Sequence, residues 1–147
     1  MIKLLSNSIL ITVIFSTVTA QVMKALIILI TDRQLVLNRL IETGGMPSSH
    51  SAAVSALATS MGLVYGWNSP YFTISVVLAA VVIHDATGVR RAAGKHAEIL
   101  NDITKQFANL FGKGFEAQTL KTLLGHTYPQ AVAGTFLGVG IALAVYH

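Results

Sequence analysis

Two histidines stand where helices are expected to begin, and their neighbours suit an anion. His50 ends the segment 47–50, Pro-Ser-Ser-His, whose proline and serines are typical of a first helical turn. His126 precedes a second such helix start. The first amides of a helix lack intrahelical partners and attract anions, and a nearby imidazole can give or take a proton. The two segments therefore predict an anion site with acid–base chemistry; the alternative is that the serines only cap a helix.

Further ionisable residues could serve the same anion: Lys24, Asp85, Arg90 and Arg91. Arginine offers paired donors to phosphoryl oxygens, and lysine adds a point charge. Beside a phosphoryl group, a neutral histidine can attack phosphorus while a protonated histidine releases the leaving alkoxide. The set predicts phosphate handling, unless the lysine only reaches for the membrane surface and the arginines only set the orientation in the membrane.

Composition places these residues in a membrane protein. Of 147 residues, 53% are hydrophobic and 11% are charged, whereas soluble domains carry roughly 25% charged residues. The absence of cysteine excludes disulfides, thiolate catalysis and cysteine-based metal sites. The net charge of +4 comes from clustered basic residues, which points to phosphate groups or anionic lipids and not to nucleic acid.

The elements that must position the site are membrane helices. We expect an all-α integral membrane bundle with about four transmembrane helices and short interfacial helices, forming a single domain over residues 1–147. The expected spans are residues 4–30, 48–65, 71–84 and 128–146. The expected interfacial helices are residues 32–43 and 97–111, the latter with apolar residues at four-residue spacing. The N-terminal stretch also resembles a signal peptide, but its apolar character continues far enough to make a span.

Four spans bring the candidate residues to one side of the membrane. Lys24 lies toward the end of the first span, His50 begins the second, Asp85 follows the third, and His126 precedes the fourth. The polar segments on that side also hold most of the basic residues. By the positive-inside tendency, we expect a multi-pass protein of the cell inner (cytoplasmic) membrane with its site on the cytoplasmic side.

Small residues are expected to let the helices approach closely. Ala52, Ala56 and Ser60 recur every fourth residue in the second span, and Gly134 and Gly138 form a glycine pair in the last. The glycine pair could join two copies in a homodimer or pack within one chain.

The pattern resembles the type-2 phosphatidic acid phosphatase and vanadium haloperoxidase superfamily, specifically its small divergent membrane branch. Residues 47–50 match its Pro-Ser-Gly-His element with serine in place of glycine, and residues 126–134 match its final histidine element. Lys24 is the counterpart of the first lysine, and residues 85–101 resemble the divergent branch. The resemblance covers the chain from about Lys24 to Gly134.

The resemblance implies roles for these residues. His126 would be the nucleophile that forms a phosphohistidine, and His50 the general acid. The phosphoryl oxygens would be held by Lys24, Ser48, Ser49, Arg90 and Arg91. Such a mechanism requires no cofactor and no metal, and its partners would be membrane lipids, with a phosphorylated lipid as substrate.

The chain also departs from the family pattern. The acid expected four residues after the nucleophile is Gln130, and the arginine expected six residues before it is Leu120. Asp85 could replace the missing acid or bind a metal ion. His96, six residues after Arg90, is a second candidate nucleophile.

We therefore expect a phosphatase that hydrolyses a lipid phosphomonoester or diphosphate. The alternatives are a catalytically weak or inactive protein that binds phosphorylated lipid heads, favoured by Gln130, and a small structural or transport-related bundle whose basic face contacts anionic lipid.

Overall fold

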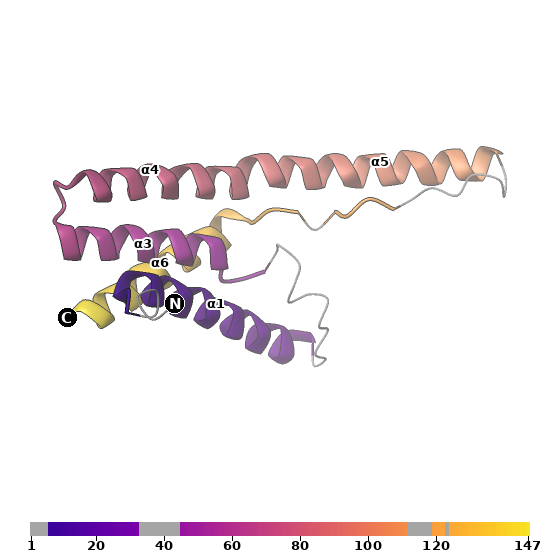
Figure 1. Cartoon of the computed structure of the whole chain (residues 1–147). Coiled ribbons are helices and arrows are strands. Elements are labelled where there is room, and N and C mark those ends of the chain that lie inside the picture. Colours follow the sequence, from indigo (N-terminus) through magenta and orange to yellow (C-terminus); the bar gives the residue numbers. More distant parts are fainter. Residues whose placement is uncertain (1–5, 33–44, 112–118, 123) are drawn as a thin grey trace.

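The computed structural model describes residues 6–32, 45–111, 119–122 and 124–147, and these form helices with no strand among them (Figure 1). The elements in chain order are α1 (Ser8–Asp32), α3 (Ser49–Tyr65), α4 (Pro70–His84), the π-helical turn η1 (Asp85–Val89), α5 (Arg90–Phe111) and α6 (Tyr128–Tyr146).

Three of the described helical stretches are long and apolar enough to cross a membrane. They are Ser8–Thr31, Pro70–Phe107 and Tyr128–Tyr146. The predicted all-α membrane bundle is thereby confirmed. Three of the four expected spans coincide with α1, α4 and α6, whose side chains are apolar on nearly every face, as expected of helices that meet lipid.

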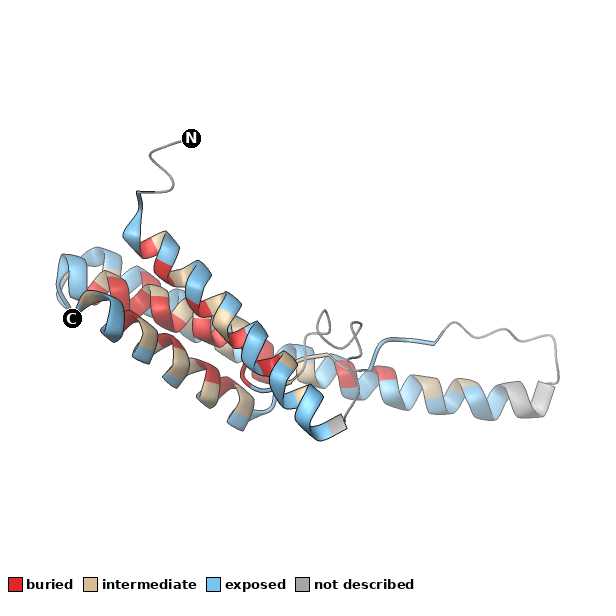
Figure 2. Cartoon of the chain, turned by 90° about the horizontal axis from the view of Figure 1, so that it is seen from below, coloured by how far each residue is buried: buried red, intermediate tan, exposed pale blue. Residues whose placement is uncertain are grey.

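The fourth expected span, α3, is the inner helix of the bundle. It packs against α1, α4 and α6 and carries more buried residues than any other described helix (Figure 2). Its 17 residues include buried hydroxyl groups, which lower its hydropathy without meeting lipid. The buried hydroxyl residues are Ser51, Ser55, Thr59 and Ser60.

The glycine pair of α6 faces α3 within the same chain. A Cβ at Gly134 would lie 2.3 Å from the Ser48 carbonyl oxygen, and one at Gly138 would lie 2.2 Å from that of Ala52. Both distances are far below van der Waals contact, so the two helices touch backbone to backbone. The glycines are thus used inside the bundle, and the expected homodimer stays a prediction.

The long third helix differs from expectation. We expected residues 97–111 to form a separate helix lying along the membrane surface, but α4, η1 and α5 form one continuous helix from Pro70 to Phe111 (Figure 1). At the usual rise per residue it is about 60 Å long, roughly twice the hydrocarbon thickness of a bilayer. The expected apolar stripe on α5 exists, and Ile99 and Ile103 on it are exposed. The expected interfacial helix at 32–43 lies almost entirely outside the described residues.

Four helix ends meet at one end of the bundle (Figure 1). These are the end of α1, the start of α3, the junction of α4 with η1, and the start of α6. At the opposite end, the Tyr146 hydroxyl donates a hydrogen bond to Ser8 Oγ at 3.1 Å. The convergence predicted for the candidate residues therefore has its structural basis in helix direction.

The close contact between α3 and α6 yields a stability prediction. We expect Gly138→Ala to lower the free energy of unfolding by about 1–3 kcal/mol, because the added methyl group overpacks the interface. Gly140→Ala is the matched control, since a Cβ there meets nothing within 4 Å. Thermal unfolding of both variants in the same detergent measures the difference. Equal melting temperatures would contradict the backbone contact.

Candidate active site

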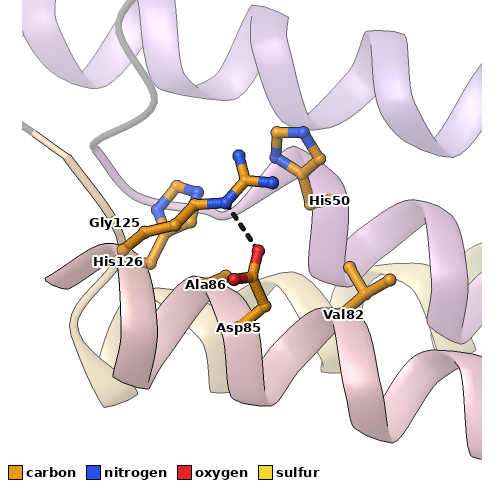
Figure 3. A pocket seen from close by; sticks show the side chains of 7 residues that line it. His50, Val82, Asp85, Ala86, Gly125 and His126 are labelled. Carbon is orange, nitrogen blue, oxygen red and sulfur yellow. Dashed lines mark hydrogen bonds and ion pairs between the residues drawn. The ribbon is translucent and has the colours of Figure 1, made fainter. Parts of the chain in front are cut away.

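An open pocket of about 260 Å³, including solvent at its mouth, lies where the helix ends meet (Figure 3). It is lined by His50, Val82, Asp85, Ala86, Arg90, Gly125 and His126. Three separate parts of the chain supply this lining: the start of α3, the α4–α5 junction, and the residues just before α6.

The two histidines face the same space from different segments. Their ring centroids are 6.2 Å apart and the rings are tilted by 56°. His50 lies in the first turn of α3 and is exposed, whereas His126 is only 6% exposed. The pair thus offers one imidazole open to solvent and one enclosed by protein.

Two backbone hydrogen bonds hold the segments around the pocket. The His126 N–H donates to the Ala86 carbonyl at 2.9 Å, which ties the residue to the π-helical turn. The Ser48 N–H donates to the Gln130 carbonyl at 3.0 Å, which ties the start of α3 to the first turn of α6. The positions of both histidines are therefore set by main-chain contacts.

Gly125 is required beside His126. Its φ of +84° belongs to the left-handed region, and a Cβ there would lie 2.5 Å from the Arg91 nitrogen. Further out, the Asn101 side chain accepts from the Leu120 N–H and donates to its carbonyl, both at 2.9 Å. These contacts hold the chain before α6 along one side of α5.

Burial and charge both act on His126. Burial lowers the pKa of His126 below its ordinary value of 6.5, and the nearby positive charges of His50, Lys24 and Arg90 lower it further, while the neighbouring Gln130 side chain opposes them. Its Nδ1 atom is buried and has no hydrogen-bond partner among the described residues. These effects favour the neutral form of the ring.

Gln130 has a structural task that the sequence analysis missed. Its Oε1 accepts a hydrogen bond from the Thr127 N–H at 2.9 Å, and the Thr127 side chain faces the Gln130 amide in return. This is a capping box, which holds the first turn of a helix. The threonine with a glutamine three residues later is its sequence signal.

Asp85 and Arg90 form an ion pair in the pocket, drawn as the dashed line in Figure 3. The Arg90 Nε donates to Asp85 Oδ2 at 2.6 Å. In an α-helix, residues five positions apart point about 140° away from each other. The π-helical turn, in which the Arg90 N–H bonds to the Asp85 carbonyl, brings them onto one side.

The structure brings together four of the eight predicted site residues, namely His50, Asp85, Arg90 and His126, which all line the pocket. Lys24 is buried on α1, and its side chain lies against Gly45. It is near enough for its positive charge to lower the pKa of His126.

The other predicted residues lie around the pocket. Ser48 is fully buried, and its hydroxyl oxygen caps α3 by accepting a hydrogen bond from the Ser51 N–H. Its own N–H donates to the Gln130 carbonyl on α6. Ser49 accepts a hydrogen bond from the Gln21 side chain at 3.3 Å. Arg91 and the alternative nucleophile His96 do not line the pocket. In the described part of the chain, no three His, Cys, Asp or Glu residues are grouped in a way that suits a metal ion.

Comparison with known proteins shows the family of the chain. The model of the Divergent PAP2 family matches residues 5–141. The chain belongs to this family. It is 38% identical over 154 aligned residues to the uncharacterized membrane protein YuiD of Bacillus subtilis (strain 168), covering 99% of this chain and 98% of that protein. No solved structure matches the chain. The resemblance read from the histidine segments is therefore confirmed, and this member of the Divergent PAP2 family is a membrane protein.

The electrostatics of the pocket give a second prediction. We expect NMR titration of histidine-labelled protein to give His126 a pKa below 6.5. Arg90→Gln should raise that pKa, because it removes a positive charge that disfavours protonation. Lys105→Gln, on the exposed part of α5, is the control that leaves it unchanged. A His126 pKa at or above 6.5 would contradict the account.

Proposed function

We propose that this protein is a membrane phosphatase that hydrolyses a phosphomonoester or diphosphate on a lipid through a phosphohistidine intermediate. The observation that carries the proposal is the pair His50 and His126, 6.2 Å apart across a pocket that also contains Arg90. Reacting atoms in near-attack geometry are about 3–3.5 Å apart, and ring centroids at this separation support a site in which both imidazoles reach one phosphoryl group.

In the first step, His126 attacks phosphorus through Nε2, because its Nδ1 is buried. The new N–P bond forms as the bond from phosphorus to the ester oxygen breaks, and protonated His50 gives its proton to the leaving alkoxide. The low pKa of His126 supports this role, since only neutral imidazole has a lone pair for attack.

In the second step, water attacks the phosphorus of the phosphohistidine. His50, now neutral, takes a proton from the water, the N–P bond breaks, and inorganic phosphate leaves. Arg90 and Lys24 stabilise the negative charge on the phosphoryl oxygens, and the first amides of α3 at Ser49 and His50 add to this.

Turnover by variants tests the mechanism. We expect His126→Asn to abolish phosphate release from phosphatidic acid, phosphatidylglycerol phosphate and a polyprenyl diphosphate. His50→Asn should reduce release by about 10²–10⁴-fold, the usual contribution of general acid–base catalysis. The loss should shrink with p-nitrophenyl phosphate, a phosphomonoester whose leaving group needs no proton. His96→Asn, outside the pocket, is the control.

Two results would overturn this assignment. Wild-type protein that releases no phosphate from any of these lipids and binds no vanadate would exclude a phosphatase. Full activity in His126→Asn would remove the proposed nucleophile. Vanadate binding without turnover would favour the second candidate, a protein that binds phosphorylated lipid heads; the feature that favours it is Gln130 in place of an acid.

We also propose that the pocket opens to the cytoplasm from the inner membrane. Basic residues at this end of the bundle support this orientation: Arg90, Arg91, Lys95, Lys105 and Lys121.

The chain has no native cysteine, so single introduced cysteines can report sidedness. Asn68 lies in the turn between α3 and α4, at the end of the bundle opposite the pocket. We expect Asn68→Cys to react when a thiol reagent that cannot cross the inner membrane is added to intact cells. Lys121→Cys should react only after the inner membrane is opened. The reverse labelling pattern would place the pocket outside the cytoplasm.

A further inference from the structure

The ion pair between Asp85 and Arg90 indicates that the two residues have different roles in the pocket. Both side chains are partly exposed, 38% for Asp85 and 50% for Arg90, and both line the same space as the two histidines. A carboxylate beside a phosphate site repels the ligand unless its charge is engaged elsewhere. Here it is engaged by the neighbouring guanidinium at 2.6 Å.

Asp85 is not placed to replace the acid that the family pattern expects beside the nucleophile. Such an acid would accept a hydrogen bond from Nδ1 of His126, and that atom has no partner among the described residues. Asp85 instead contacts Arg90. In the described part of the chain, it also belongs to no group of three residues suited to a metal ion.

The geometry of the guanidinium suits an orienting role for the carboxylate. Asp85 accepts from Nε, the donor on the side of the guanidinium nearest the main chain. The two terminal NH₂ groups are then the donors available for a forked contact with two phosphoryl oxygens. Arginine loses side-chain freedom when it binds, and a partner that holds it beforehand reduces that cost.

We propose that Asp85 is a positioning residue that holds Arg90 in the orientation that binds a tetrahedral oxyanion, and that the π-helical turn η1 exists in this chain to place the two residues side by side. This inference rests on the proposed function, since it deepens the role of the same pocket. It assigns Asp85 neither a proton-transfer step nor a metal.

Affinity for inorganic orthovanadate, measured by titration of the purified full-length protein, tests the inference without requiring turnover. We expect Arg90→Gln to weaken binding by at least about tenfold, as for loss of a hydrogen bond to a charged group. Asp85→Ala should weaken it by a similar factor. Asp85→Asn should retain most of the affinity, because its amide oxygen still accepts from Nε of Arg90.

The double variant decides whether Asp85 acts through Arg90. We expect the double variant Asp85→Ala, Arg90→Gln to bind vanadate as well as Arg90→Gln alone. Once Arg90 is replaced, Asp85 no longer has a guanidinium to hold, so its loss should have no further effect. Asp102→Ala is the matched control, an exposed carboxylate beside Lys105 on α5. Its affinity should equal that of the wild type.

Turnover adds a readout that separates positioning from proton transfer. We expect Asp85→Asn to leave the pH profile of kcat unchanged and Asp85→Ala to raise KM more than it lowers kcat. Additive losses in the double variant, or an Asp85→Asn variant that loses as much affinity as Asp85→Ala, would overturn the inference. So would a wild-type protein that binds no vanadate. Non-additive binding in a protein without turnover would sustain the inference while the proposed phosphatase fails.

Discussion

Two main-chain hydrogen bonds at the start of α6 are the constraint on which the pocket depends. One joins the His126 N–H to the Ala86 carbonyl, and the other joins the Ser48 N–H to the Gln130 carbonyl. Together they connect the π-helical turn, the start of α3 and the start of α6. Because both involve backbone atoms, they hold the histidine segments in place and leave the side chains available for the proposed chemistry.

The bond between Ser48 and Gln130 forms where α3 and α6 approach more closely than ordinary side chains permit. Gly134 and Gly138 let the α6 backbone rest on the carbonyls of Ser48 and Ala52. Gly125, with its positive φ, turns the preceding chain against Arg91 and the same π-helical turn. Glycines on either side of His126 therefore determine both the helix packing and the geometry of the pocket.

Features set by hydropathy and helix direction could be predicted from the sequence, whereas features set by contact between segments could not. The length of the apolar stretches predicted α1, α4 and α6. The direction of the helices correctly predicted that Lys24, His50, Asp85 and His126 lie at one end of the bundle. The π-helical turn could not be foreseen, because nothing in Asp-Ala-Thr-Gly-Val distinguishes an i→i+5 turn from an α-helix. The expectation of a separate helix from residue 97 was wrong, because α4, η1 and α5 continue without interruption.

Gln130 shows why a motif can keep its architecture while changing its electrostatics. At this position glutamine completes the capping box with Thr127, a structural task that a glutamate could also perform. A carboxylate so close to His126 would favour the imidazolium form, against the burial and the positive charges that lower its pKa. A neutral amide does not favour the imidazolium form in this way, and Asp85, which lines the pocket, is already paired with Arg90. The pocket therefore places positive charge beside a histidine whose neutral form is favoured.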